Sequence, residues 1–172
     1  MRVRLKLLAG LAAIGWGGLA PASAADAWTY RENGNDGHIL TYSDAGMTTF
    51  FLGCGRGFAL HVKYPGTAKK AGKARITISI AKTRMAFDGE FEDPVPMNMA
   101  TDFRQTYLGF RRQDPQLYGK RWMAIKSRLL DLIGSGEPLT ISAGTSSYRL
   151  PPIDAANWRA PFDACGKAGS WN

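Results

Sequence analysis

The stretch "FFLGCGRGFALHVKY", residues 50–64, predicts two β-strands joined by a glycine-rich turn that carries a cysteine. In its second half Phe58, Leu60 and Val62 alternate with small or polar residues, which is the pattern of a strand with one buried face. Cys54 continues the same alternation at the end of the first strand, so we expect its side chain to point into the core. The glycines enter a strand and not a helix, which distinguishes this turn from a phosphate-binding loop.

The period-two pattern extends in both directions from this hairpin. Turn residues separate the segments, and sequential strands with short turns favour an antiparallel sheet that is covered on one face. The predicted strands are 27–31, 38–43, 47–53, 57–64, 74–80, 85–91, 103–112, 138–144 and 146–150.

The period changes once, after residue 114. Asp114 and Pro115 have the residue types of an N-cap and a first helical position, and Gly134 is expected to end the helix in the left-handed conformation. Apolar residues recur between them at helical spacing and predict one stripe of an amphipathic helix. The stripe contains Tyr118, Trp122, Ile125, Leu129, Leu132 and Ile133. The segment 151–166 is expected to form a loop and a short helical turn.

The N-terminal residues 1–24 have the pattern of a secretory signal peptide. A basic start precedes an apolar stretch, and the small residues Ala22 and Ala24 mark a cleavage site. The expected mature domain is 25–172, and it contains no second apolar segment that would span a membrane. The leader holds 3 of the 22 basic residues and none of the 14 acidic ones, so cleavage lowers the net charge from +8 to +5. We therefore expect a protein of the periplasm or a secreted protein.

Cys54 and Cys165 are the two cysteines of the chain, and an even count in an exported domain favours a disulfide. The alternative is a catalytic thiol, which needs a nearby base. The two histidines, His38 and His61, lie in no nucleophile motif and have no metal-ligand spacing, so we expect surface histidines, no metal site and no cofactor. The predicted fold class is therefore mainly β, an antiparallel β-sandwich or curved sheet with one packed amphipathic helix, closed by a disulfide.

Carboxylates at the end of the strand 85–91 are the nearest approach to a catalytic pair. Asp88 and Glu90, followed by Glu92 and Asp93, would suit acid–base chemistry on a glycan. A hairpin around a four-residue turn at 81–84 would instead place Glu90 opposite Arg75 and Glu92 opposite Lys73. Opposite charges across a strand pair are common in sheets, so we expect a structural role for these carboxylates and no catalytic residue.

Basic residues gather around the predicted helix and form a possible surface for an anionic partner. An envelope protein or an anionic envelope polymer is the expected partner, whereas nucleic acid is not expected, because exported proteins seldom meet it. A solvated helix face is the simpler alternative. The residues are Arg111, Arg112, Lys120, Arg121, Lys126 and Arg128.

The order of these features resembles small envelope proteins of Gram-negative bacteria, namely the invasion associated locus B family and the accessory periplasmic proteins of type VI secretion. The resemblance covers roughly 48–166 and rests on "FLGC" (51–54), "LLDLIGSG" (129–136), "LTIS" (139–142) and "AC" (164–165). The chain departs from the invasion family by having a single cysteine pair. The resemblance implies a non-enzymatic envelope factor.

The expected function is therefore a non-enzymatic periplasmic or secreted binding or accessory protein. One alternative is an inhibitor of an envelope-attacking enzyme such as lysozyme, although a basic chain suits a basic target badly. Another is a glycan hydrolase that uses Asp88 or Glu90.

Overall fold

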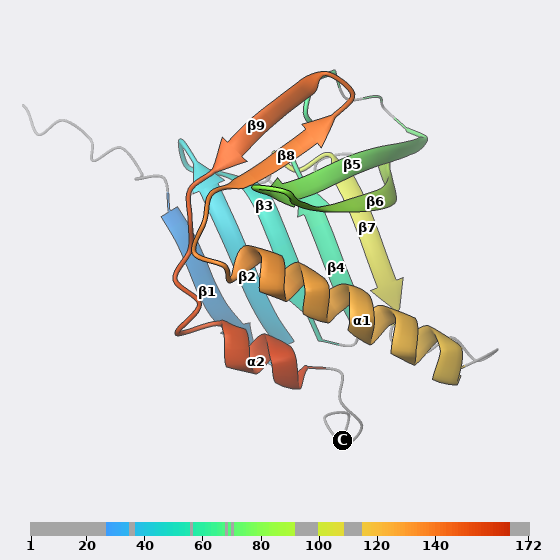
Figure 1. The fold of residues 1–172 in the computed structure, drawn as a ribbon, viewed down its shortest axis with the longest axis vertical. Coiled ribbons are helices and arrows are strands. Elements are labelled where there is room, and N and C mark those ends of the chain that lie inside the picture. The colour runs from blue at the N-terminus through green and yellow to red at the C-terminus, as the bar shows by residue number, and fades with distance from the viewer. Residues whose placement is uncertain are drawn as a thin grey trace, which may run out of the picture.

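The computed structural model describes residues 27–34, 37–55, 57–67, 69, 71–91, 100–108 and 115–165, and gives the backbone alone for 57, 105–108 and 115–122. This part of the chain holds nine strands and two helices (Figure 1). The strands are β1 (Ala27–Asn33), β2 (Gly37–Asp44), β3 (Met47–Cys54), β4 (Gly57–Val62), β5 (Lys73–Ile80), β6 (Thr83–Phe91), β7 (Phe103–Leu108), β8 (Leu139–Ala143) and β9 (Ser146–Leu150). The helices are α1 (Pro115–Ile133) and α2 (Arg159–Ala164).

The strands form one curled antiparallel sheet in the order β1-β2-β3-β4-β7-β6-β5-β8-β9. The first four strands follow one another as a meander, and β7 then returns between β4 and the β5–β6 hairpin. Figure 1 shows α1 and α2 on the same side of β2, β3 and β4. The predicted fold class, a curved antiparallel sheet with a packed helix, is confirmed, with α2 as a second, short helix.

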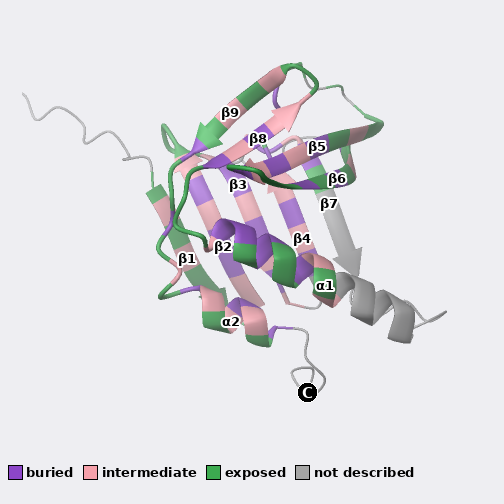
Figure 2. Cartoon of the chain, viewed as in Figure 1, coloured by how far each residue is buried: buried purple, intermediate pink, exposed green. Residues whose placement is uncertain are grey.

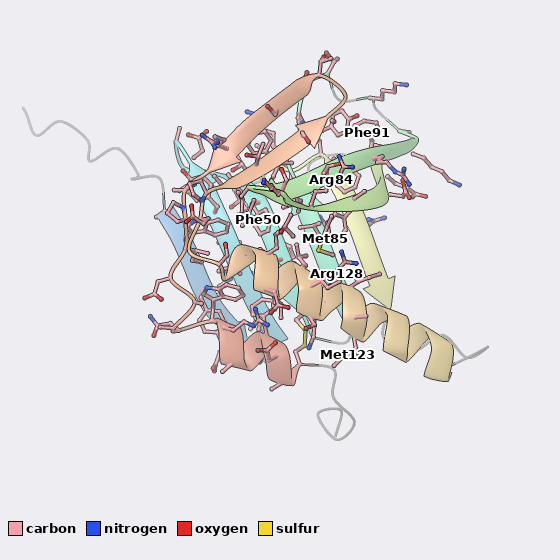
Figure 3. All side chains as sticks on the ribbon, in the orientation of Figure 1. Phe50, Arg84, Met85, Phe91, Met123 and Arg128 are labelled. Carbon is pink, nitrogen blue, oxygen red and sulfur yellow. A yellow bond between two sulfur atoms is a disulfide. The ribbon has the colours of Figure 1, made fainter. Side chains whose placement is uncertain are left out.

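The core lies between the strands and the helices. Alternate residues of β2–β6 are buried, and α1 adds an apolar stripe (Figure 2). Figure 3 shows two of the strand side chains of this core, Phe50 and Met85, together with Met123 of α1, which packs against it. The buried residues of α1 are Leu129, Leu130, Leu132 and Ile133, and those of the segment after β9 include Ile153, Trp158 and Phe162.

The junction between β6 and β7 requires a glycine. There Glu90 pairs with Arg104 and Phe91 with Phe103. A Cβ atom on Gly89 would lie 2.3 Å from the carbonyl oxygen of Arg104 and 2.5 Å from the ring of Phe103. Glycine therefore permits the close approach of the two strands at the point where the chain order of the sheet changes.

The β5–β6 register differs from the sequence prediction by two residues. The turn contains two residues, Ala81 and Lys82, because Ile80 pairs with Thr83. Ala81 has a φ of 48°, a conformation that alanine rarely adopts and that its residue type does not signal. As a result Arg75 faces Asp88, and the prediction that it faces Glu90 is wrong.

The C-terminal end of α1 also differs from the expectation. Gly134 still donates its N–H to the carbonyl of Leu130 at 2.9 Å and is not left-handed. The positive φ, 77°, occurs two residues later at Gly136. In the part of the chain that the structure describes, neither helix is long and apolar enough to cross a membrane.

Candidate functional site

A disulfide joins Cys54, the last residue of β3, to Cys165, which directly follows α2. The Cα atoms are 6.2 Å apart, and both side chains are buried. The predicted bridge is confirmed, and the described residues include no free cysteine. Cys54 points into the core, as the alternation along β3 predicted. It therefore has a structural role and is not part of a reactive loop.

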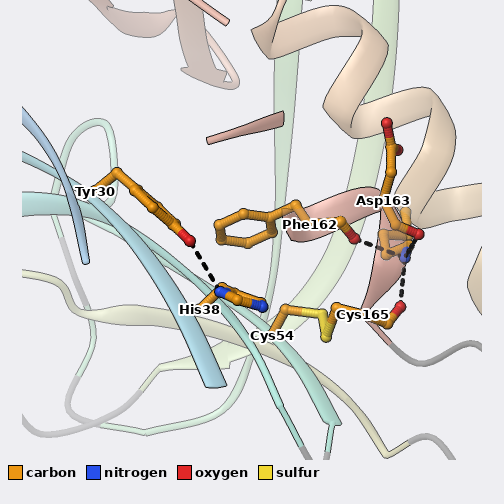
Figure 4. The surroundings of a disulfide bond; sticks show 7 residues. Tyr30, His38, Cys54, Phe162, Asp163 and Cys165 are labelled. Atoms are coloured by element: carbon orange, nitrogen blue, oxygen red, sulfur yellow. Dashed lines mark hydrogen bonds between the residues drawn. A yellow bond between two sulfur atoms is a disulfide. The ribbon is translucent and has the colours of Figure 1, made fainter. Parts of the chain in front are cut away.

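A buried lysine on α1 holds the same end of α2. The Nζ atom of Lys126 donates hydrogen bonds to the carbonyl oxygens of Phe162 at 2.8 Å, Asp163 at 3.2 Å and Cys165 at 2.5 Å. Figure 4 shows these three residues beside the bond to Cys54. The last carbonyls of a helix lack partners within the helix and form the negative end of its dipole. A cation that meets several of them offsets the cost of its own burial.

This position corrects the predicted basic surface. Lys126 is 1% exposed and points into the protein, while Arg128 is exposed. Arg111 and Arg112 lie outside the described residues. Lys120 and Arg121 belong to α1, but their side chains lie outside the described part. Of these six residues the structure describes the side chains of Lys126 and Arg128, and of these two only Arg128 can belong to a basic helix surface.

The sequence contained a signal for Lys126 that the prediction missed. Lys126 lies four residues after Trp122 and three before Leu129, which places it within the apolar stripe of α1. A charged residue at a stripe position needs a buried partner. Here the partner is a helix end far along the chain, which the sequence pattern alone does not reveal.

An aromatic cluster packs beside the bridge. His38 lies opposite Cys54 in the β2–β3 register, and its Nδ1 is 3.0 Å from the hydroxyl oxygen of Tyr30. The ring of Phe162 lies 6.4 Å from that of Tyr30 and 6.1 Å from that of His38, centroid to centroid. Burial, and then the charge of Glu32, raise the pKa of Tyr30. His38 is therefore a half-buried neighbour of the bridge and not the surface histidine that was expected.

The second histidine is on the outer face of the sheet. His61 packs edge-on against Phe51 with the ring centroids 5.2 Å apart. Among the described residues no three His, Cys, Asp or Glu side chains gather where they would hold a metal ion.

The carboxylates of β6 face cations across the sheet. Asp88 accepts hydrogen bonds from Arg75 at 2.5 and 2.7 Å. This contact lowers the pKa of Asp88 and raises that of Arg75. Glu90 lies between Lys73 and Arg104 in the strand register. Glu92 and Asp93 lie outside the described residues.

A second polar network ties β9 to the end of β4. Asp102 accepts a hydrogen bond from the backbone N–H of Tyr64, and the hydroxyl of Tyr148 donates to the carbonyl oxygen of Lys63 at 2.7 Å. Burial raises the pKa of Asp102, against the opposing effects of the Tyr64 N–H and the charge of Lys63. Burial and the charge of Asp102 also raise the pKa of Tyr148. The two hydrogen bonds join the segment after β4 to Asp102, directly before β7, and to β9.

Comparison of the chain with family models, with curated proteins and with solved structures finds no match.

Proposed function

We propose that the protein is an exported, non-enzymatic binding or accessory protein of the bacterial envelope, located in the periplasm or secreted. The observation that carries this proposal is the buried Cys54–Cys165 bridge. Structural disulfides persist in oxidising compartments and are rare in the cytosol. The leader pattern of residues 1–24 would deliver the chain to such a compartment.

The surroundings of the bridge support a scaffold role. Its two cysteines are buried, and Lys126 fixes the carbonyl of Cys165 independently of the sulfur–sulfur bond. Such a bridge holds the C-terminal segment on the sheet and leaves the sulfur atoms shielded from substrates.

The surroundings of the β6 carboxylates favour binding over acid–base catalysis. Asp88 accepts hydrogen bonds from the Nε and Nη2 atoms of Arg75, and Glu90 lies between two cationic residues of the neighbouring strands in the register. Arg75 lowers the pKa of Asp88, which makes Asp88 a poor proton donor at neutral pH. Because Glu90 has cationic register neighbours on both sides, replacement of Glu90 by Gln should abolish no activity, whereas loss of a measured activity in a correctly folded variant would favour a glycan hydrolase.

Mass spectrometry of the protein from its native host tests the proposal. We expect an N-terminus at Ala25, a molecule two hydrogen atoms lighter than its reduced form, and a location outside the cytoplasm. Capture of partners from envelope extract by the oxidised protein should then recover an envelope protein or an anionic polymer. A cytoplasmic protein that retains the leader and has two free thiols would contradict the proposal.

A further inference from the structure

Four strands present a row of polar side chains on the outer face of the sheet, opposite the core. The pairing register aligns Arg84 of β6, Ser79 of β5, Thr140 of β8 and Arg149 of β9 side by side. Neighbouring strands are about 4.8 Å apart, so the two arginines stand at the ends of a row roughly 14 Å long. Arg84 and Arg149 are exposed, and the two hydroxyl residues between them are half-buried.

A second row runs parallel to the first. It contains Ala86, Thr77, Ser142 and Ser147, again as register neighbours on β6, β5, β8 and β9. The alternating residues Ile76, Ile78 and Ile141 point the other way and are fully buried, which fixes the outward direction of both rows. We call the two rows together the hydroxyl face: Arg84, Ser79, Thr140, Arg149, Ala86, Thr77, Ser142 and Ser147.

The hydroxyl face is positively charged, and no carboxylate among the described residues pairs with its arginines. Neither Arg84 nor Arg149 makes an ion pair or a hydrogen bond with any residue that the structure describes, and Lys82 in the adjoining turn adds a further exposed cation. The next carboxylate on β6, Asp88, is already paired with Arg75. Glu137 lies in the loop before β8 and forms no ion pair with the arginines.

We propose that the hydroxyl face binds an anionic glycan. The arginines would pair with acidic groups of the polymer, and the serine and threonine hydroxyls would exchange hydrogen bonds with sugar hydroxyls. This inference rests on the proposed function and names the chemistry of one partner. The surface proposed for an anionic partner is therefore the outer face of β5, β6, β8 and β9, and not the basic residues of α1.

The composition of the two rows favours a glycan over an acidic protein. Protein interfaces depend on a few large apolar or aromatic anchors that become fully buried. Ala86 is the sole apolar residue of the hydroxyl face, and the other seven residues are five serines or threonines and two arginines. Short side chains on a rigid sheet lose little conformational entropy on binding, which suits a polar ligand.

The test measures binding of the oxidised mature protein to alginate oligosaccharides and to dextran sulfate oligosaccharides by isothermal titration calorimetry at low salt. Neutral dextran is the ligand control. We expect the Arg84→Gln/Arg149→Gln protein to bind both anionic glycans at least about tenfold more weakly than the wild type, because it loses two charge-assisted contacts. The affinity should also fall as salt is added.

A matched control variant removes the same charge elsewhere. Arg31 on β1 and Arg128 on α1 are exposed, and neither belongs to the hydroxyl face. The Arg31→Gln/Arg128→Gln protein should bind within about twofold of the wild type, apart from the small effect of net charge. A further variant, Ser79→Ala/Thr140→Val, keeps every charge and should weaken binding by roughly threefold through the lost hydroxyls.

Three results would overturn the inference. One is an equal loss of binding in the two arginine variants, which would indicate net charge alone, and another is a larger loss in the Arg31→Gln/Arg128→Gln protein. The third is no binding of either anionic glycan by the wild type. If envelope extract then yields a protein partner for the exported, oxidised chain, the proposed function stands without the glycan. Retention of the protein in the cytoplasm would instead contradict the proposed function, which requires export.

Discussion

The Nζ atom of Lys126 lies 2.5 Å from the carbonyl oxygen of Cys165, the residue whose sulfur is bonded to Cys54. Cys165 is thereby held twice, through its side chain by β3 and through its backbone by α1. The short helix α2 has six residues and little stability of its own. These two attachments hold the C-terminal end of α2, in addition to the burial of Phe162 and the ion pair of Arg159 with Asp131.

Replacement of Lys126 by Met should destabilise the protein strongly. Methionine nearly preserves the length of the side chain but leaves three carbonyl oxygens without their donor. Loss of a buried charged donor costs about 2–4 kcal/mol of the free energy of unfolding. Urea denaturation followed by circular dichroism measures the change.

The control for this variant is Arg128→Met, which removes one positive charge from an exposed position on the same helix. Surface changes of this kind are usually within about 0.5 kcal/mol of neutral. Equal effects of the two substitutions would show that Lys126 does not hold α2.

The disulfide should be complete, and either cysteine should be equally important for stability. Thiol titration of the denatured, non-reduced mature protein should find no free thiol. Cys54→Ser and Cys165→Ser should each lower the free energy of unfolding by about 2–5 kcal/mol, since each breaks the same bond. The double variant should be no worse than either single one. Two free thiols, or unequal effects of the two substitutions, would contradict this expectation.

Arg75 should be energetically coupled to Asp88 and not to Glu90. The guanidinium contacts both carboxylate oxygens of Asp88, which is two residues nearer the turn than Glu90. A double-mutant cycle with Arg75→Gln and Asp88→Asn should give a small favourable coupling, and the cycle with Glu90→Gln a smaller one. A larger coupling energy of Arg75 with Glu90 than with Asp88 would instead favour the four-residue turn that the sequence pattern predicted.

This ion pair also predicts a pH dependence. Arg75 holds the pKa of Asp88 below 3.8 in the folded protein, so the unfolded chain binds more protons between the folded value and 3.8. Stability should therefore rise with pH through that window and should be lost as the pH falls through the folded pKa. The Asp88→Asn protein should lack this contribution in urea denaturation measured at several acidic pH values.

Asp102 should show the opposite sign. Burial holds its pKa above 3.8, so between 3.8 and the folded value the native state binds more protons. Its contribution should fall as the pH rises through that window. Asp102→Asn, which keeps an acceptor for the N–H of Tyr64, should remove the fall. Asp44→Asn, at the exposed β2–β3 turn, is the matched control for charge, and NMR titration of the Asp102 carboxyl measures the shift directly.

Local pattern predicted most of the strands and the helix. The alternation of Phe58, Leu60 and Val62 placed β4 and its buried face correctly. Successive side chains of a strand point to opposite faces, so a local pattern is enough to show which residues share a face. The turn before β6 was misplaced because Ala81 adopts a positive φ that glycine or asparagine would have signalled. The same reasoning assigned the left-handed residue to Gly134, whereas Gly136 adopts it.

Features that depend on distant parts of the chain were not predictable in this way. The insertion of β7 between β4 and β6 is a choice among many possible strand orders, and the close approach at Gly89 becomes visible only once that order is known. The partners of Lys126 lie 36 to 39 residues away. The hydroxyl face likewise requires the β5–β8 pairing, which joins strands that are far apart in sequence.

The disulfide between Cys54 and Cys165 closes part of the chain into a ring, and the arm that precedes this ring carries β1, β2 and most of β3. Positions 54–165 form the ring, so a protease that cuts once anywhere within it leaves all fragments joined until a reductant is added. The strands β1 and β2 lie in the arm, where a single cut at the turn of Ala45 and Gly46 releases the β1–β2 hairpin from every covalent tie. That hairpin carries Tyr30 and His38, which pack against Phe162 beside the bridge. Cleavage at this turn would therefore leave the packing of Tyr30 and His38 on Phe162 to non-covalent contacts alone, because the disulfide ring does not include β1 and β2.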